Sequence, residues 1–375
     1  MNSKYMKIAI DLAKKGKGRV YTNPLVGCVI VKGNKVIGKG WHKYFGGEHA
    51  EINALTDAGR SAIGSDLYVT LEPCNSYGKR PPCTLAIIKA GIKRVYYAVH
   101  DKNVLGSKEI LEKNGVEIYS GLLKGQTEIL MKDYLKYLES KPKVSVKAAM
   151  TLDGKIATYE YDSKWITSKK SRKVVYKMRS LYDAVLVGAN TALKDNPFLT
   201  VHSKKLKNPV RVVIDSNLKL PRLHNLFDSS VPTVVIYDLN ITDIPKYLGK
   251  EGIILAPVDI NAAKKDFSII VKKLNSFSIK RILIEGGSEI IASALFSNVV
   301  DDIYFFVAPR IIGGKTSISV VGGNGVKRIS ESLRVKNMGI KKIASDFLIT
   351  GQIDKAYPSS RHLLLEMEST VKSLL

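Results

Sequence analysis

The sequence predicts two α/β domains in series, joined near Pro142. Strand-like and helix-like segments alternate through the first half of the chain, a pattern typical of layered α/β domains. A long helix-like stretch, 125–140, ends just before Lys141-Pro142, and proline cannot continue a helix. A second alternating series runs from residue 143 to about 353. The length of 375 residues also favours two domains of ~100–200 residues each. We therefore expect domains at 1–143 and 144–353, with a peripheral C-terminal helix at 354–375 that has no assigned role.

Turn and cap residues divide both halves into short elements. Met6, Ile10 and Ala13 follow a helical spacing near the N-terminus. Residues 27–42 predict a hairpin that turns at Gly33-Asn34. The strands expected next are 65–73, 93–101 and 116–121, and the helices are 50–58, 83–91, 107–115 and 125–140. The second α/β series continues through the segments 143–157, 183–191, 210–216, 232–238, 281–296, 301–314 and 346–353.

Composition and charge narrow the class of protein. Hydrophobic residues make up 45% and charged residues 25% of the chain, an ordinary globular profile. No apolar run approaches the ~18–20 residues that cross a bilayer, and the N-terminus lacks the apolar core of a signal peptide, so we expect a cytoplasmic protein without membrane contact. Three cysteines do not make a disulfide scaffold. The net charge of +25 comes from scattered lysines on solvated faces, which favours an anionic small molecule over nucleic acid as the partner.

A histidine, a glutamate and two cysteines form the first candidate site. In "GEHAEINAL", His49 and Glu51 lie two apart, a spacing that brings both to one point only at a tight entry into a helix. Downstream, Cys74 and Cys83 precede the apolar helix 83–91, whose N-terminus favours the thiolate. One imidazole and two thiolates make a three-ligand zinc site with an open fourth position, as catalytic zinc requires.

The same residues match a known reaction type. The order H-x-E…P-C…C is that of zinc nucleobase deaminases, in which the glutamate moves protons and is not a ligand. Glu51 is therefore predicted to take a proton from the attacking water and pass it to the leaving amine. A solvated histidine unrelated to a metal is the alternative for His49. Cys28, within an apolar strand, is expected to be a buried structural residue.

The long spacer between the cysteines points to one family. Eight residues separate Cys74 from Cys83. With "TNPLVGCVIV" and "GWHKYFGGEHAE" upstream, this half resembles the deaminase domain of the bifunctional riboflavin-biosynthesis deaminase–reductase, which acts on diaminohydroxyphosphoribosylaminopyrimidine. The resemblance implies a cytidine-deaminase-like three-layer fold. It also implies substrate contacts from Asn23, His42, Lys79, Asp101 and Asn103. The sequence departs from the family at Ser76 and Arg80. It also departs in the segment "HDKNV", where the family usually has Asp-Pro-Asn-Pro.

The second half carries a different glycine motif. It has no G-x-G-x-x-G, so a Rossmann dinucleotide fold is not supported. In "RILIEGGSEIIASALF" a buried strand leads through Glu285 and Gly286-Gly287 to Ser288, which opens an apolar helix. Glycines at such a junction allow close backbone approach, and a helix N-terminus attracts phosphate. Many α/β turns contain two glycines for steric reasons alone.

Together with "KAAMTLDGKIA", "SKWITS" and "VLVGANTALKDNPFLTV", this motif resembles the reductase domain of the same bifunctional enzyme, which implies a dihydrofolate-reductase-like fold and NADPH. The cofactor contacts implied are Met150, Trp165, Thr191, Asp195, Ser216, Gly287 and Ser288. The substrate contacts implied are Ser163, Arg179, Leu199, His202 and Glu285, although His202 stands where the family usually has arginine. Lys147 and Asp195 are the candidates for polar assistance to hydride transfer. Without the resemblance, Trp165 reads as a half-buried core aromatic and Arg179 as a solvated helix cation.

The sequence is compatible with three functions. The first is a two-step enzyme of riboflavin biosynthesis, expected as a homo-oligomer, that uses Zn²⁺ and NADPH on phosphorylated pyrimidines. The second is a base editor of tRNA or DNA, which needs aromatic residues on a basic groove and has no use for a reductase half. The third is a binding protein with structural zinc, which needs a fourth protein ligand.

Overall fold

The chain forms two compact units, Met1–Ser140 and Lys141–Leu375. The computed structural model describes residues 2–20, 23–75, 82–101, 107–203, 205–228, 230–250 and 252–355. Lys79 and Asn103, the departures at Ser76 and Arg80, and nearly all of the expected C-terminal helix lie outside these ranges. The division at Ser140 comes three residues before the boundary expected from the sequence, because Lys141 and Pro142 group with the strand that follows them.

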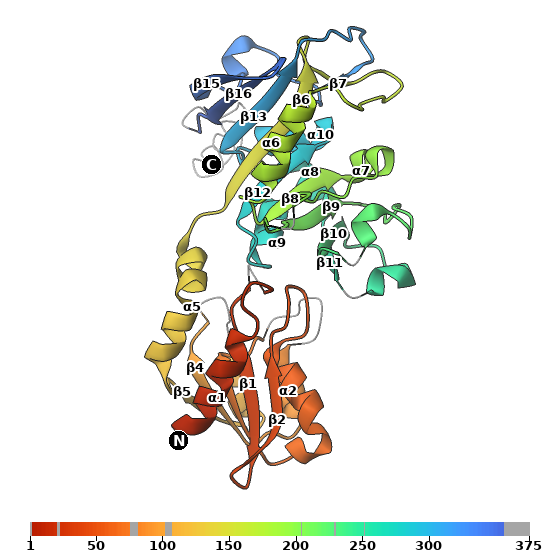
Figure 1. The fold of residues 1–375 in the computed structure, drawn as a ribbon. Helices are drawn as coiled ribbons and strands as arrows, with labels where there is room; N and C mark the ends of the chain where they lie inside the picture. Colours follow the sequence, from red (N-terminus) through yellow and green to blue (C-terminus); the bar gives the residue numbers. More distant parts are fainter. Residues whose placement is uncertain are drawn as a thin grey trace, which may run out of the picture. The chain divides into compact units, whose positions relative to one another are not determined.

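The first unit is built on a mixed five-stranded sheet with the order β2-β1-β3-β4-β5 in the described residues (Figure 1). The strands are β1 (Gly27–Lys32), β2 (Lys35–Trp41), β3 (Asp66–Leu71), β4 (Arg94–Val99) and β5 (Glu117–Ser120). β1 pairs antiparallel with β2 and β3, whereas β3, β4 and β5 are parallel. The carboxyl ends of β3 and β4 therefore meet at one edge of the sheet, where the loops that follow them can share a site.

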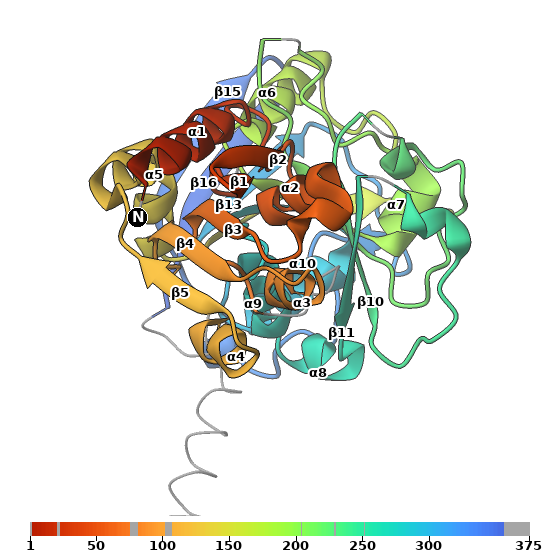
Figure 2. The ribbon, with the colours of Figure 1, turned by 90° about the horizontal axis from the view of Figure 1, so that it is seen from below.

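Helices cover both faces of this sheet. They are α1 (Ser3–Lys14), α2 (Ala50–Ala58), α3 (Cys83–Lys89), α4 (Ser107–Lys113) and α5 (Lys124–Glu139). Figure 2 shows α1 and α5 on one face and α2, α3 and α4 on the other. Met6, Ile10 and Ala13 of α1 are buried, as their spacing predicts, and Cys28 is fully buried in β1.

Two glycines of β2 bring α2 close to the sheet. A Cβ on Gly40 would lie 2.2 Å from the carbonyl oxygen of Ala50, and one on Gly38 would lie 2.5 Å from that of Ala54. Any larger residue at either position would push α2 outward. The glycines in "VIGKGW" thus fix the depth of the helix that carries Glu51.

The second unit contains a nine-stranded sheet with the order β11-β10-β9-β8-β12-β6-β13-β16-β15 in the described residues. Its strands are β6 (Lys143–Thr151), β8 (Ala184–Gly188), β9 (Val210–Ile214), β10 (Thr233–Asp238), β11 (Ile253–Val258), β12 (Arg281–Gly286), β13 (Asp302–Ala308), β15 (Val335–Ile343) and β16 (Asp346–Ile353). The strands from β11 to β13 are parallel, and β16 and β15 continue the sheet antiparallel. A short ribbon pairs β7 (Lys155–Ala157) with β14 (Ile318–Ser319).

The helices of this unit are α6 (Lys169–Arg179), α7 (Ala189–Asp195), α8 (Ile260–Lys265), α9 (Ser268–Asn275) and α10 (Ser288–Phe296). The strand order reverses direction at β6 and β12, because β8 to β11 follow on one side and β13 on the other. Since parallel crossovers are right-handed, α6 and α7 lie on one face and α8 to α10 on the other (Figure 1). A reversal of this kind opens a crevice at the carboxyl ends of the strands.

The elements expected from the sequence up to residue 353 are present, and several more were not foreseen. The unforeseen helices and strands are α6, α7, α8, α9, β11, β14 and β15. α6 has the sequence KKSRKVVYKMR, in which six basic residues outweigh the few apolar ones that face the core. β15 is exposed along most of its length, so it lacks the apolar alternation that identifies a half-buried strand. Among the described helices, none is long and apolar enough to cross a membrane.

Candidate active sites

The entry into α2 places His49 and Glu51 beside each other. His49 is the N-cap residue, with extended backbone angles (φ −67°, ψ 158°), and Glu51 follows in the first helical turn. Asn53 ties this entry to β2, because its side-chain amide donates to the carbonyl oxygens of Trp41 (2.9 Å) and Glu48 (3.3 Å). The change from extended to helical backbone therefore explains how two residues that diverge on a regular helix meet at one site.

Two cysteines complete the cluster. Cys74 lies in the loop after β3, and Cys83 is the first residue of α3. His49 Nδ1 lies 3.2 Å from Cys83 Sγ and 3.5 Å from Cys74 Sγ. The three donor atoms lie within 4.8 Å of one another. This spacing and the N/S₂ donor set fit tetrahedral zinc with one position open, and across the described residues the group contains three donors and no fourth.

The charges of the cluster are strongly coupled. A hydrogen bond from Cys83 lowers the pKa of Cys74 to about 4, and His49 adds to this effect. Partial desolvation lowers the pKa of His49, but Cys74 and Glu51 outweigh this and raise it to about 9. Burial raises the pKa of Glu51 to about 7. Cys74 is thus the thiol most readily available as a thiolate, the form that binds metal.

His42 and Asn23 line the same region. The His42 ring lies 5.9 Å from that of His49, edge to face. His42 Nε2 is 3.0 Å from Asn23 Nδ2, and His42 Nδ1 is 3.0 Å from the carbonyl oxygen of Glu48. Burial lowers the pKa of His42 to about 3, so the ring is neutral. Of the substrate contacts expected for this half, Asp101 follows β4 at the same edge of the sheet, whereas Lys79 and Asn103 lie outside the described residues.

A buried charge cluster marks the second unit. Glu285, near the end of β12, accepts two hydrogen bonds from Arg179 (2.7 and 2.9 Å) and one from Lys147 (3.2 Å). Burial alone would raise the pKa of Glu285, but the two cations lower it to about 2. Arg179 also donates to the carbonyl oxygen of Thr200 (2.8 Å). Arg179 is therefore buried and paired, which excludes a solvated helix cation at this position.

Most residues expected at the cofactor lie along one edge of the sheet. Met150, Thr191, Ser216, Gly287 and Ser288 come at or just after the carboxyl ends of β6, β8, β9 and β12. Gly287 packs against Thr191, because a Cβ on Gly287 would lie 2.9 Å from Thr191 Oγ1. Gly286 has φ 137°, which favours glycine. This glycine turn at the N-terminus of α10 fits a phosphate-bearing cofactor.

The other expected residues lie in smaller groups. Ser163 Oγ donates to Asp195 (2.9 Å). Trp165 is 64% exposed and stacks on the Arg172 guanidinium at 4.1 Å, so it is not a core aromatic. The His202 ring lies 4.5 Å from that of Tyr176. Leu199 has a positive φ, and its side chain is buried in the apolar core. The structure, which describes both residues, records no hydrogen bond or ion pair between Lys147 and Asp195.

Sequence reasoning missed the segment that closes over α10. Ser288 Oγ donates to the carbonyl oxygen of Ser319 (2.5 Å), and its carbonyl oxygen accepts from Gly322 N (3.2 Å). Glu289 accepts from Gly323 N (3.1 Å). A Cβ on Gly322 would lie 2.3 Å from the Glu289 carboxylate. The paired glycines of "VVGGNG" are a sequence signal that could have indicated this close approach.

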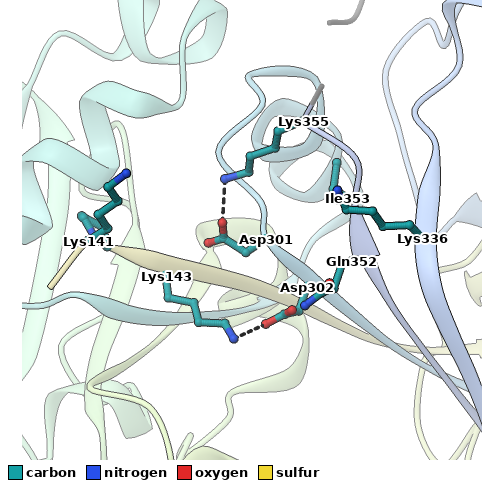
Figure 3. Close-up of a pocket in the computed structure, with 9 residues that line it drawn as sticks. Lys141, Lys143, Asp301, Asp302, Lys336, Gln352, Ile353 and Lys355 are labelled. Carbon is teal, nitrogen blue, oxygen red and sulfur yellow. Dashed lines mark hydrogen bonds and ion pairs between the residues drawn. The ribbon is translucent and has the colours of Figure 1, made fainter. Parts of the chain in front are cut away.

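A cavity of about 460 Å³ lies at the opposite edge of the sheet. In Figure 3, Lys143 pairs with Asp302 (2.8 Å) and Lys355 with Asp301 (2.6 Å) across it. Lys143 and Asp302 open β6 and β13, so this cavity is at the amino ends of the strands. It is therefore separate from the glycine turn and from the expected cofactor residues.

Comparison with known proteins assigns both units. Residues 1–99 match the cytidine and deoxycytidylate deaminase zinc-binding region, and residues 142–349 match the RibD C-terminal domain. The riboflavin biosynthesis protein RibD of Aquifex aeolicus is 40% identical over 355 residues, covering 93% of this chain and 98% of its own. The chain belongs to the RibD family.

Other RibD proteins agree with this assignment. The Escherichia coli protein is 30% identical over 359 residues, covering 91% of this chain and 96% of its own. The solved RibD structure from Acinetobacter baumannii has a TM-score of 0.53 and 30% identity, covering 94% of this chain and 98% of that one. The chain is thus a two-domain enzyme of riboflavin biosynthesis, with a zinc-binding deaminase domain and a reductase domain that uses NADPH. The predicted fold class, family and pair of activities are confirmed, and a reductase domain leaves no role for the base-editor and structural-zinc alternatives.

Proposed function

We propose that the first unit deaminates 2,5-diamino-6-(phosphoribosylamino)pyrimidin-4(3H)-one to 5-amino-6-(5-phosphoribosylamino)uracil, with zinc held by His49, Cys74 and Cys83. The second unit then reduces the ribosyl group to the ribityl group. The observation that carries the proposal is the position of Glu51 in the first turn of α2, two residues after His49, whose donor atom lies within 4.8 Å of those of Cys74 and Cys83.

In the deaminase step, Glu51 is the group that moves protons. Bound zinc lowers the pKa of water toward ~7, which supplies a nucleophile at neutral pH. Glu51 accepts a proton from the attacking water and gives it to the amino group that leaves as ammonia. Its buried position, 4% exposed, keeps the carboxylate away from bulk water. Asn23 and His42 face the same region and contact the base. Lys79, Asp101 and Asn103 complete the contacts to the substrate.

In the reductase step, the chain positions two ligands. NADPH supplies the hydride, and the anomeric carbon accepts it after the ribosyl ring opens to an imine. Met150, Trp165, Thr191, Asp195, Ser216, Gly287 and Ser288 would hold the cofactor, and five of them, all but Trp165 and Asp195, come at or just after the carboxyl ends of strands. Ser163, Arg179, Leu199, His202 and Glu285 contact the substrate. Lys147 and Asp195 assist the transfer with polar groups, and Glu285 fixes the ammonium of Lys147 at 3.2 Å.

The family assignment also supports a proposal for the binding partners and location of the enzyme. The substrates are small phosphorylated pyrimidines, and the net charge of +25 attracts such anions. We place the enzyme in the cytoplasm as a homo-oligomer that binds neither nucleic acid nor membrane. The predicted domain limits, 1–143 and 144–353, are assigned to the deaminase and reductase activities, and the expected helix at 354–375 has no assigned role.

One assay tests both halves. Purified protein is incubated with zinc, NADPH and the diaminopyrimidine ribotide, and ammonia release and NADPH absorbance are followed together. We expect ammonia release followed by NADPH oxidation. Absence of ammonia would contradict the deaminase assignment. Ammonia release without NADPH oxidation would contradict the reductase assignment alone.

A further inference from the structure

A buried carboxylate outside the metal cluster connects the two loops at the edge of the first sheet. Glu72 directly follows β3, two residues before Cys74, and is 6% exposed. We propose that Glu72 is a positioning residue for the deaminase: it holds the backbone at Asp101 so that the Asp101 side chain meets the substrate. The inference rests on the proposed function, in which Asp101 contacts the substrate.

The contacts of Glu72 all reach the end of β4. Its backbone N–H donates to the carbonyl oxygen of Val99 (2.9 Å). Its Oε2 accepts from the backbone N–H of Asp101 (3.3 Å) and is in direct contact with His100 Nδ1. Main chain and side chain of one residue therefore hold three consecutive positions, 99 to 101. The His100 side chain is 64% exposed, whereas that of Glu72 is 4% exposed, so the carboxylate lies beneath the loop.

Neither His100 nor Asp101, the two described residues that follow β4, is a proline. A proline would restrict the backbone by itself, so the start of this loop depends on hydrogen bonds. The buried carboxylate of Glu72 is suited to holding this backbone, because its removal would break the hydrogen bond that the Asp101 N–H now donates to it.

The location indicates a role in function rather than in stability alone. β3 and β4 are also joined at their amino ends, by an ion pair between Asp66 and Arg94 (2.6 Å). That pair lies at the far edge of the sheet from Cys74. The same two strands thus carry one acidic link at each end, and only the Glu72 link lies beside the metal cluster and Asp101. Asp66 provides a matched control.

The test compares Glu72→Leu and Glu72→Gln with Asp66→Asn in the full-length, zinc-loaded enzyme. Steady-state ammonia release gives kcat and KM, and metal analysis gives the zinc content. Hydrogen exchange reports the protection of the Asp101 amide, and thermal unfolding reports stability. NADPH oxidation with the deaminated intermediate serves as an internal control for the second unit.

We expect Glu72→Leu to raise KM roughly tenfold with kcat little changed, because a ground-state contact is displaced. The Asp101 amide should exchange faster, and zinc content should be unchanged. Glu72→Gln, which keeps a neutral acceptor, should show a smaller rise in KM. Asp66→Asn should lower the unfolding temperature without changing KM.

Three results would overturn the proposal. An unchanged KM in Glu72→Leu would show that the link does not position the substrate loop. Loss of zinc from either Glu72 variant would show that the residue supports the metal loop instead. A rise in KM of equal size in Asp66→Asn would show that both links only stabilise the fold and that neither positions the substrate. A wild-type enzyme that released no ammonia would instead contradict the proposed function itself.

Discussion

The two candidate sites are built in opposite ways. The metal cluster of the first unit comes from two helix starts and one loop, and its three donors lie within 35 residues of one another in the sequence. The charge cluster of the second unit joins Glu285 to Arg179 and Lys147, which lie 106 and 138 residues earlier in the sequence. The first site depends on local backbone geometry, whereas the second depends on strand order.

The two sites should respond differently to the loss of one residue. Loss of one donor from the metal cluster should prevent metal binding, and we expect the effect to be confined to the deaminase. Loss of one member of the buried charge cluster leaves uncompensated charges in the core of the second unit. Variants of the metal cluster should therefore lose deaminase activity and keep reductase activity. Variants of the charge cluster should lose reductase activity together with stability of the second unit.

The largest expected effect is the loss of zinc in Cys83→Ser. A serine hydroxyl does not ionise as a thiol does, so the variant should lose both zinc and deaminase activity. Metal analysis and ammonia release measure this, and reduction of supplied intermediate should persist. Cys28→Ala is the matched control, because Cys28 is buried in β1 and is not one of the three donors, so this variant should retain zinc. A Cys83→Ser variant with full zinc content would remove Cys83 from the ligand set.

Glu51→Gln should retain zinc but lower kcat for ammonia release by about 10²–10⁴-fold, the usual contribution of a general acid–base group. The amide cannot carry the proton between water and amine. Reduction of supplied deaminated intermediate should continue at the wild-type rate. Loss of reductase activity in this variant would contradict the assignment of the two reactions to separate units.

Glu285→Gln should destabilise the second unit by about 3–5 kcal/mol, the usual cost of breaking a buried ion pair. The pKa of Glu285 falls from 4.5 to about 2 on folding, so its contribution to stability is present above pH 4.5 and is lost as the pH falls toward 2. Denaturant unfolding of the wild type should show this loss, about 3 kcal/mol at ~1.4 kcal/mol per pKa unit. The same pH dependence in Glu285→Gln would assign it to another group.

The smallest expected effect is that of Gly287→Ala. The new Cβ would lie 2.9 Å from Thr191 Oγ1, so the turn before α10 must shift and NADPH should bind roughly tenfold more weakly. Fluorescence titration with NADPH measures this, and deaminase activity should be unchanged. Gly249→Ala is the control, because no atom lies within 4 Å of its added Cβ. Equal NADPH affinity in the two variants would place the cofactor away from this turn.

The sequence by itself determined the metal cluster and most of the elements. Zinc ligands are few in kind, so His49, Cys74 and Cys83 were recognisable from residue type and order. Glycines, prolines and apolar periodicity set helix and strand limits because they act over a few residues. The family motifs also named Lys147, Arg179 and Glu285, but gave no indication that these side chains form one buried group.

Only the tertiary structure decided which distant side chains meet. Glu285 contacts Arg179 and Lys147 because β12 pairs with β6 and α6 covers that face of the sheet. Strand order cannot be predicted from local sequence patterns. Glu72 reads in sequence as the end of a strand, and its role emerges only because parallel β3 and β4 end side by side. Local physical chemistry fixes what a segment of ten residues prefers, whereas contacts between segments follow from the packing of the whole chain.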